Sequence, residues 1–222
     1  MLRSFALAVA VAWVSVAWVS LVASAAPLGQ QDIVNLCGNA EDAGHCGRII
    51  EEAQLKRLPN LARREGSALV ISLYPSGTTT FKDSDDPVNG RSYSLWDFLD
   101  PINAVVLYST AGDSISFIVL RRTSNRRFEL PAEPHLSPDR LHIVTADVCP
   151  DHCVNEIAVW SVSSDALRKE WVWTPRAAWS DVNASWKDST TLTIEYTPAG
   201  TDKPVVVERK LADPVWKRIP PD

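Results

Sequence analysis

Residues 67–74, Ser-Ala-Leu-Val-Ile-Ser-Leu-Tyr, are followed by Pro-Ser-Gly at 75–77 and by Thr-Thr-Thr-Phe at 78–81. This pattern is typical of a β-hairpin, because two runs rich in branched and aromatic side chains flank a turn. Further runs of this kind follow, each bounded by Gly, Pro, Asn, Asp or Ser. They cover residues 92–99, 103–109, 114–120, 141–146, 156–162, 168–173, 190–196 and 204–209. The sequence therefore predicts an all-β fold over residues 67–222.

The segment before the hairpin has helical rather than strand-like spacing. Between Asp42 and Leu61, apolar side chains such as Ile50 and Ala53 recur at helical intervals, with charged residues between them. Pro59 favours an end to the helix near this point. We expect one short N-terminal helix, inside a disulfide-containing segment that spans residues 26–66.

The first 25 residues have the three parts of a secretory signal peptide. Arg3 gives the positive start, residues 5–22 are an apolar run, and Ala23-Ser-Ala25 fits a cleavage site. We expect cleavage after Ala25 and a periplasmic or secreted protein of a bacterium. The apolar run is close to the minimum of roughly 17 residues for a membrane-spanning helix, so an uncleaved anchor is the alternative. Beyond it, we expect the mature domain not to span a membrane.

The charge balance and the motifs limit the function classes. The chain carries 22 Lys and Arg against 27 Asp and Glu, a formal net charge of −5. Such acidity argues against a nucleic-acid partner, which would favour a basic patch. No nucleotide-binding loop, G-x-S-x-G or H-E-x-x-H motif occurs. We therefore expect no cofactor and predict no catalytic residue. A small hydrolase with an unrecognised site is the alternative, since a catalytic triad is spatial rather than sequential.

Four cysteines follow the signal segment, namely Cys37, Cys46, Cys149 and Cys153. An even number in an exported chain favours disulfides, and the spacing favours the local pairs Cys37–Cys46 and Cys149–Cys153 among the three connectivities possible. A zinc site built from Cys149, His152 and Cys153 is the alternative, because zinc accepts these ligand types. The oxidising compartment favours the disulfides.

Aromatic and acidic residues offer two further candidate sites. Trp171 and Trp173 share one face of a predicted strand. Core packing is the simpler interpretation, and an aromatic platform for a glycan or protein is the alternative. Residues 83–90 are rich in Asp and Asn but lack the closing glutamate of an EF-hand loop, so we favour a hairpin turn over a calcium site.

A loose repeat runs through the β part. Asp100, Asp139 and Asp188 each precede a pair of β-runs, at intervals of 39 and 49 residues. Such intervals suit a four-stranded blade of roughly 40–50 residues. Residues 136–144, Leu-Ser-Pro-Asp-Arg-Leu-His-Ile-Val, followed by Asn-Glu-Ile-Ala-Val-Trp at 155–160, resemble the "SPDG" blade element of TolB-like and WD-type β-propellers. In this sequence Arg140 occupies the place of the usual turn glycine.

The stretch from about Leu69 to Trp216 also resembles secreted bacterial proteins that carry a single such element. The resemblance implies a small β-propeller-like repeat arrangement, with a two-sheet β-sandwich as the alternative. It implies a scaffold that binds a protein, and no catalytic residues. We therefore expect an exported, non-enzymatic binding module of the bacterial cell envelope, whose partner is an unknown protein or glycan. The other hypotheses are the hydrolase and a metal-binding protein that uses Cys149 to Cys153.

Overall fold

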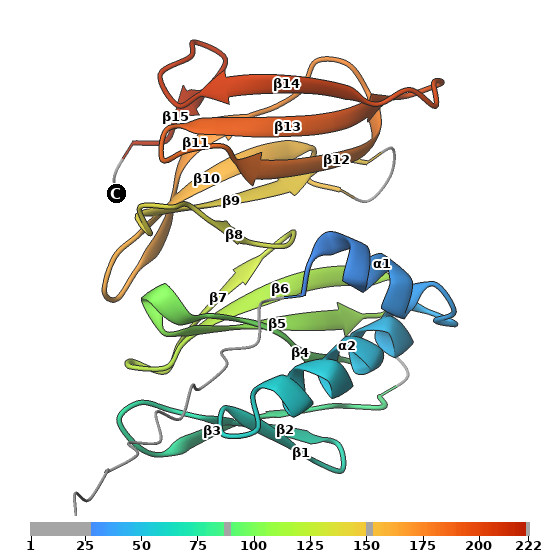
Figure 1. Cartoon of the computed structure of the whole chain (residues 1–222), viewed down its shortest axis with the longest axis vertical. Helices are drawn as coiled ribbons and strands as arrows, with labels where there is room; N and C mark the ends of the chain where they lie inside the picture. The colour runs from blue at the N-terminus through green and yellow to red at the C-terminus, as the bar shows by residue number, and fades with distance from the viewer. Residues whose placement is uncertain (1–27, 87–89, 150–152, 221–222) are drawn as a thin grey trace, which may run out of the picture.

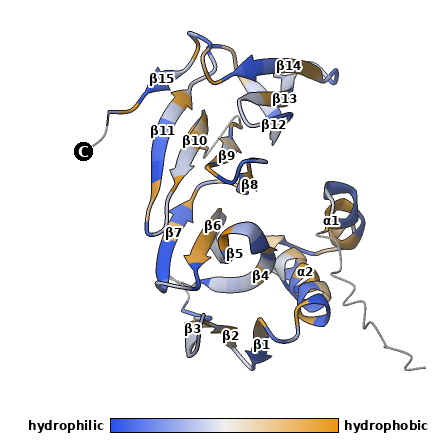
Figure 2. Cartoon of the chain, turned by 60° about the vertical axis from the view of Figure 1, so that its left-hand side comes forward, coloured by the Kyte–Doolittle hydropathy of each residue, from blue (hydrophilic) through white to orange (hydrophobic). Residues whose placement is uncertain are grey.

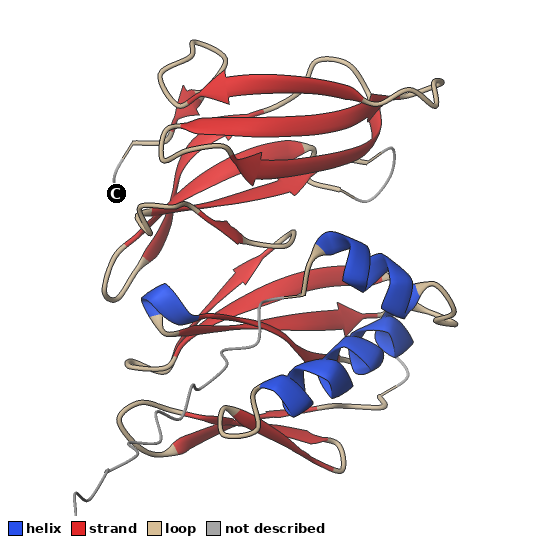
Figure 3. Cartoon of the chain, in the orientation of Figure 1, coloured by secondary structure: helices blue, strands red, loops and turns tan. Residues whose placement is uncertain are grey.

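The computed structural model describes residues 28–86, 90–149 and 153–220. These residues form β-strands in four antiparallel sheets, together with two α-helices and one short 3-10 helix (Figure 3). The predicted all-β class is confirmed. The predicted signal peptide and its alternative, the anchor, lie outside the described residues. No helix among the described residues is long and apolar enough to cross a membrane.

The four sheets follow one another along the chain. The first sheet contains β1 (Ala62–Glu65), β2 (Ala68–Ser72) and β3 (Thr78–Lys82). The second contains β4 (Ser92–Leu99), β5 (Ala104–Ala111), β6 (Ser114–Arg121) and β7 (Arg126–Leu130), with the 3-10 helix Asp100–Ile102 between β4 and β5. Each of these sheets is a meander, because each strand pairs with the next one in sequence.

The third sheet contains β8 (His135–Leu136), β9 (His142–Asp147), β10 (Glu156–Val162) and β11 (Leu167–Trp173), and β15 (Lys217–Arg218) joins its edge beside β11. The fourth contains β12 (Trp179–Trp186), β13 (Thr191–Pro198) and β14 (Val205–Lys210). The chain therefore returns from the fourth sheet to complete the third.

The sheets are stacked in an open row, with β1–β3 at one end and β12–β14 at the other (Figure 1). Apolar layers fill the spaces between them. The first layer joins Leu69 and Phe81 of the first sheet to Leu107 of the second, and the last joins Val159 of the third to Leu192 of the fourth. Four sheets rather than two are stacked, and the described residues close no barrel.

Because side chains alternate between the two faces of a strand, an inner sheet contributes side chains to the apolar layers on both of its sides. In β5, Val105 and Leu107 contact the first layer. Val106 and Tyr108 contact the middle layer, which lies between the second and third sheets and includes Ile143 of β9. Residues 104–109 are all buried, as in a strand that is covered on both faces. In Figure 2, β6 is strongly hydrophobic, while the neighbouring edge strand β7 is hydrophilic.

The helices cover one side of the stack (Figure 1). Helix α2 (Ala43–Arg57) begins after Asp42, whose Oδ1 accepts a 2.7 Å hydrogen bond from the amide of His45. Gly47 lets α2 lie close to the second sheet, because a Cβ at this position would lie 2.8 Å from Cδ1 of Tyr108. The side chain of Ile50 is fully buried in the middle layer.

Two expectations about this region are corrected. The predicted helix over 42–61 ends at Arg57, because residues 58–61 form a turn that leads into β1. A second helix, α1 (Gln30–Cys37), precedes α2, so the expectation of a single helix is wrong. Ile33, Leu36 and Cys37 of α1 do have helical spacing and pack against the apolar layer between the second and third sheets, but the sequence analysis did not use this signal.

The three repeat aspartates occupy equivalent places. Asp100, Asp139 and Asp188 lie between the first and second strands of the second, third and fourth sheets. In the third sheet, Oδ1 of Asp139 accepts a 3.0 Å hydrogen bond from the amide of Leu141. Arg140 adopts the left-handed conformation with φ 66°, which is the backbone geometry that a turn glycine would provide. The turn therefore forms despite the arginine.

Candidate functional site

Both predicted disulfides are present, Cys37–Cys46 and Cys149–Cys153. The first joins the end of α1 to α2, and the second closes a loop between β9 and β10. Because both thiols of the proposed zinc site are oxidised, they are not thiolate ligands. His152 lies outside the described residues, among which no group of three metal-ligating side chains occurs.

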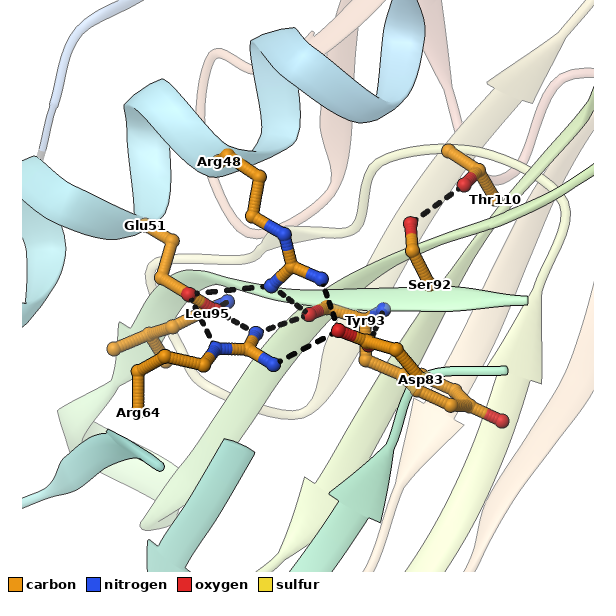
Figure 4. Close-up of polar contacts among 8 residues, drawn as sticks. All are labelled: Arg48, Glu51, Arg64, Asp83, Ser92, Tyr93, Leu95 and Thr110. Carbon is orange, nitrogen blue, oxygen red and sulfur yellow. Dashed lines mark hydrogen bonds and ion pairs between the residues drawn. The ribbon is translucent and has the colours of Figure 1, made fainter. Parts of the chain in front are cut away.

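The candidate calcium ligand Asp83 is used inside the protein (Figure 4). Its Oδ1 accepts a 2.9 Å hydrogen bond from the amide of Tyr93, and its Oδ2 pairs with the guanidinium groups of Arg48 and Arg64. Both arginines also contact Glu51, whose side chain is almost completely buried. Asp83 thus belongs to a balanced network of two cations and two carboxylates, which joins α2, β1 and β4. Residues 87–89 of the predicted turn lie outside the described residues.

Trp171 and Trp173 both pack against the layer between the third and fourth sheets. The ring of Trp171 lies 5.5 Å from the ring of His142, and the ring of Trp173 contacts those of Trp179 and Trp216 edge-on. The guanidinium carbon of Arg209 lies over the ring of Trp173, 5.4 Å from its centre. The two indoles therefore do not form a shared exposed platform.

Trp173 also lines an open hollow of about 700 Å³ at the edge of the third sheet. Arg176 and Lys217 lie on its rim, and the exposed Val215 contributes to its wall. Of the two candidate binding aromatics, only Trp173 lines this hollow.

A more enclosed pocket of about 500 Å³ lies where the second, third and fourth sheets meet α1. Its walls come from the first strands of these three sheets, β4, β8 and β12, together with the segment that opens α1. Most of the lining is apolar or aromatic, with Ile33, Leu99, Leu136 and Trp186 as examples. A volume of this size is in the range of small-molecule sites.

A β-bulge in β4 directs two consecutive side chains into this pocket. The pairing of β4 with β5 shifts between Leu95, which faces Leu107, and Asp97, which faces Val106. Trp96 is therefore the extra residue, and both Trp96 and Asp97 line the pocket. In a regular strand, neighbouring side chains point to opposite faces. Bulges that re-aim a side chain are frequent beside functional sites.

Three titratable side chains line the pocket. Asp97 comes from β4, Glu133 from the segment that leads into β8, and His135 from the start of β8. The indole Nε1 of Trp96 donates a 2.7 Å hydrogen bond to Oε1 of Glu133. The indole Nε1 of Trp186 donates a 2.8 Å bond to the backbone oxygen of His135. The two indoles therefore hold the segment 133–135 in place.

Asp97 is a partly buried acid with an unusual environment. Its Oδ1 lies 2.7 Å from Nη2 of Arg57, which is itself mostly buried. Burial raises the pKa of Asp97 above the ordinary value, although the amide of Phe98, the Arg57 guanidinium and the charge of His135 act in the opposite direction. A carboxylic acid with a raised pKa beside an imidazole can act as a proton donor or acceptor.

Helix α1 forms one wall of the pocket through Gln30 and Ile33. The side-chain oxygen of Gln30 accepts a 2.9 Å hydrogen bond from Nδ2 of Asn183 in β12. At its other end, α1 is fixed to α2 by the Cys37–Cys46 disulfide.

The sequence analysis identified none of the pocket's polar residues. A bulge leaves no clear trace in a single sequence, and the only available signal was the adjacent pair Trp96 and Asp97, which breaks the alternation of residues 92–99. Comparison with known proteins finds no matching family model, no similar curated protein and no similar solved structure.

Proposed function

We propose that this chain is an exported, non-enzymatic binding module of the bacterial cell envelope, and that it takes a small ligand into the pocket beneath α1. The observation that carries the proposal is the β4 bulge, which places Trp96 and Asp97 side by side in a mainly apolar pocket. Departing from regular strand pairing forfeits ladder hydrogen bonds, so a bulge that only reorients two side chains points to a use for them.

The resemblance to propeller blades fits the same proposal. Four successive antiparallel sheets, with aspartates in equivalent turns of three of them, support a scaffold of blade-like repeats. In our proposal these blades form an open row instead of a closed ring, and the ligand pocket lies along their first strands.

Two disulfides are compatible with an oxidising compartment and support a periplasmic or secreted location. Intact mass after alkylation without reduction tests this part. The expected product begins at Ala26 and carries no alkylated thiol. A product that retains Met1 and has free thiols would contradict export.

A pair of matched variants tests the pocket itself. Ser185→Trp places a bulky side chain at the pocket rim, where Ser185 is exposed, so the fold should tolerate it. Ser180→Trp makes the same change on the same strand, outside the pocket lining. The readout is the set of small molecules from an envelope extract that remain with the purified protein, identified by mass spectrometry. We expect the wild type and Ser180→Trp to retain a common compound that Ser185→Trp loses; identical sets for all three proteins would contradict a pocket ligand.

One observation favours the hydrolase as a second candidate function. Asp97, with its raised pKa, shares a pocket with Glu133 and His135. The hydrolase predicts turnover of model esters, glycosides or amides that Asp97→Asn abolishes. Turnover that persists in Asp97→Asn, or no turnover by the wild type, would leave the binding role as the supported one.

A further inference from the structure

The charges of the pocket are not balanced. Asp97 has a cationic partner in Arg57, 2.7 Å away. Glu133 has no ion pair within the part of the chain that the structure describes, and its one hydrogen bond comes from the neutral indole of Trp96. That bond uses Oε1, so Oε2 of Glu133 is available to a ligand. Among the described residues, Glu133 is therefore the one carboxylate of the pocket lining without an ion pair.

The surroundings of Glu133 strengthen the attraction of its carboxylate for a cation. The carboxylate is partly buried, and its neighbour Pro134 is buried. Apolar side chains such as Leu136 and Leu99 line the same space. An ionised group is costly in such surroundings unless it has a partner, and its attraction for an opposite charge is stronger than in water.

We propose that the ligand of this pocket is a small organic cation, in which an ammonium group is attached to an apolar body. The ammonium pairs with Glu133, and the body contacts the apolar and aromatic walls. A neutral ligand of the same shape would leave the Glu133 carboxylate desolvated and unpaired, and an anionic one would be repelled by Glu133 and Asp97. This inference rests on the proposed function, because it assigns a ligand class to the same pocket.

Three molecules of nearly the same shape test the charge preference. Cyclohexylammonium, cyclohexanol and cyclohexanecarboxylate are titrated into the full mature protein at pH 8, and binding is followed by ligand-observed NMR. Tryptophan fluorescence gives a second readout, since Trp96 and Trp186 line the pocket. We expect the cation to bind at least about tenfold more tightly than the alcohol, equivalent to ~1.4 kcal/mol, and the carboxylate to bind most weakly.

Variants then locate the preference. Glu133→Gln removes the charge but keeps an oxygen that can accept the hydrogen bond from Trp96, so binding of the cation should fall to the level of the alcohol. Glu133→Asp keeps the charge and should retain part of the preference. Glu65→Gln is the control, because Glu65 is an exposed residue of β1 in the first sheet, outside the pocket lining.

Each other outcome overturns the inference. Equal binding of the cation and the alcohol would show a pocket that selects for shape, and a preference unchanged in Glu133→Gln would place the cation elsewhere. Failure of the cation to bind would also overturn it. None of these outcomes decides the proposed function, which depends on whether Ser185→Trp loses a compound from the extract. If Glu133→Gln does not fold, the ranking of the cation, the alcohol and the carboxylate by the wild type still tests the charge preference.

Discussion

Arg64 and Glu51 meet at two points, with Nε 2.8 Å from Oε1 and Nη2 2.6 Å from Oε2. The pair joins β1 to α2, and Oε2 of Glu51 also accepts a 2.9 Å bond from the amide of Leu95 in β4 (Figure 4). Arg48 and Asp83 balance the remaining charge. Glu51 is 3% exposed, so this carboxylate depends on its protein partners rather than on water.

Loss of the Glu51 charge should destabilise the protein strongly. In Glu51→Gln, the two partly buried guanidinium groups of Arg48 and Arg64 share one remaining carboxylate, and removal of one partner of a buried ion pair typically costs about 3–5 kcal/mol. The control is Glu52→Gln, because Glu52 pairs with Lys56 on the exposed side of the same helix, where solvent screening leaves such a pair with little effect on stability. Urea denaturation gives both free energies of unfolding. Equal costs for the two variants would contradict the structural role of the network.

Tyr108 should make stability depend on pH in the alkaline range. Burial, assisted by the charge of Asp42, raises the pKa of Tyr108 from 10.0 to about 12. Between these values the unfolded chain releases the phenolic proton while the folded protein retains it. The contribution of Tyr108 is therefore complete below about pH 10 and is lost as the pH rises through about 12.

Tyr108→Phe provides the measurement, since it removes the titrating hydroxyl. Thermal unfolding between pH 9 and 12 should show a smaller fall in Tm for Tyr108→Phe than for the wild type. Tyr74→Phe is the control, because Tyr74 is 57% exposed. A fall in Tm that is the same in all three proteins would assign the alkaline loss to other groups.

Local patterns predicted the strands rich in apolar and aromatic residues well. The runs 92–99 and 156–162 coincide with β4 and β10, because turn residues bound each of these runs on both sides. The strands that the sequence analysis missed contain polar or charged residues that interrupt the apolar pattern. β12 contains Asp181, Asn183 and Ser185, residue types that strands disfavour, and it forms because its partner β13 supplies the apolar residues. β1 and β7 contain adjacent arginines and lie at sheet edges.

The candidate site was less predictable than the fold. Its two carboxylates, Asp97 of β4 and Glu133 of the segment before β8, are 36 residues apart in the sequence. Their meeting depends on how the second and third sheets stack, and the alignment of Asp97 depends on the bulge at Trp96. The disulfides were predictable because each pair is local, with separations of 9 and 4 residues.

Arg140 should limit the stability of the β8–β9 turn. Its φ of 66° is a left-handed conformation that costs a residue with a Cβ roughly 1–2 kcal/mol and costs glycine almost nothing. We expect Arg140→Gly to raise the free energy of unfolding by up to about 1 kcal/mol, because the greater flexibility of glycine in the unfolded chain offsets part of the gain. The reciprocal change Gly112→Ala, at φ 57° in the β5–β6 turn, should lower stability by a similar amount. Destabilisation by Arg140→Gly would show that the arginine side chain contributes contacts that outweigh the strain.

The Cys37–Cys46 disulfide should hold α1 over the pocket. Helix α1 has no fully buried side chain, it is only eight residues long, and it contacts the sheets through the bond between Gln30 and Asn183 and through partly buried apolar side chains such as Ile33. A helix of this length is marginal without tertiary contacts. In the double variant Cys37→Ser and Cys46→Ser, amide hydrogens of residues 31–37 should exchange at least about tenfold faster, corresponding to ~1.4 kcal/mol of local stability.

The matched comparison is the double variant Cys149→Ser and Cys153→Ser, which opens the other disulfide and should leave exchange in α1 unchanged. Hydrogen-exchange mass spectrometry on both proteins separates a local effect from global destabilisation, because buried amides of β5 report the latter. If α1 keeps its protection without Cys37–Cys46, the apolar contacts of Ile33 and Leu36 with the middle layer must hold the helix. The wall of the pocket would then be a fixed part of the fold and would not depend on the oxidation state of the two cysteines.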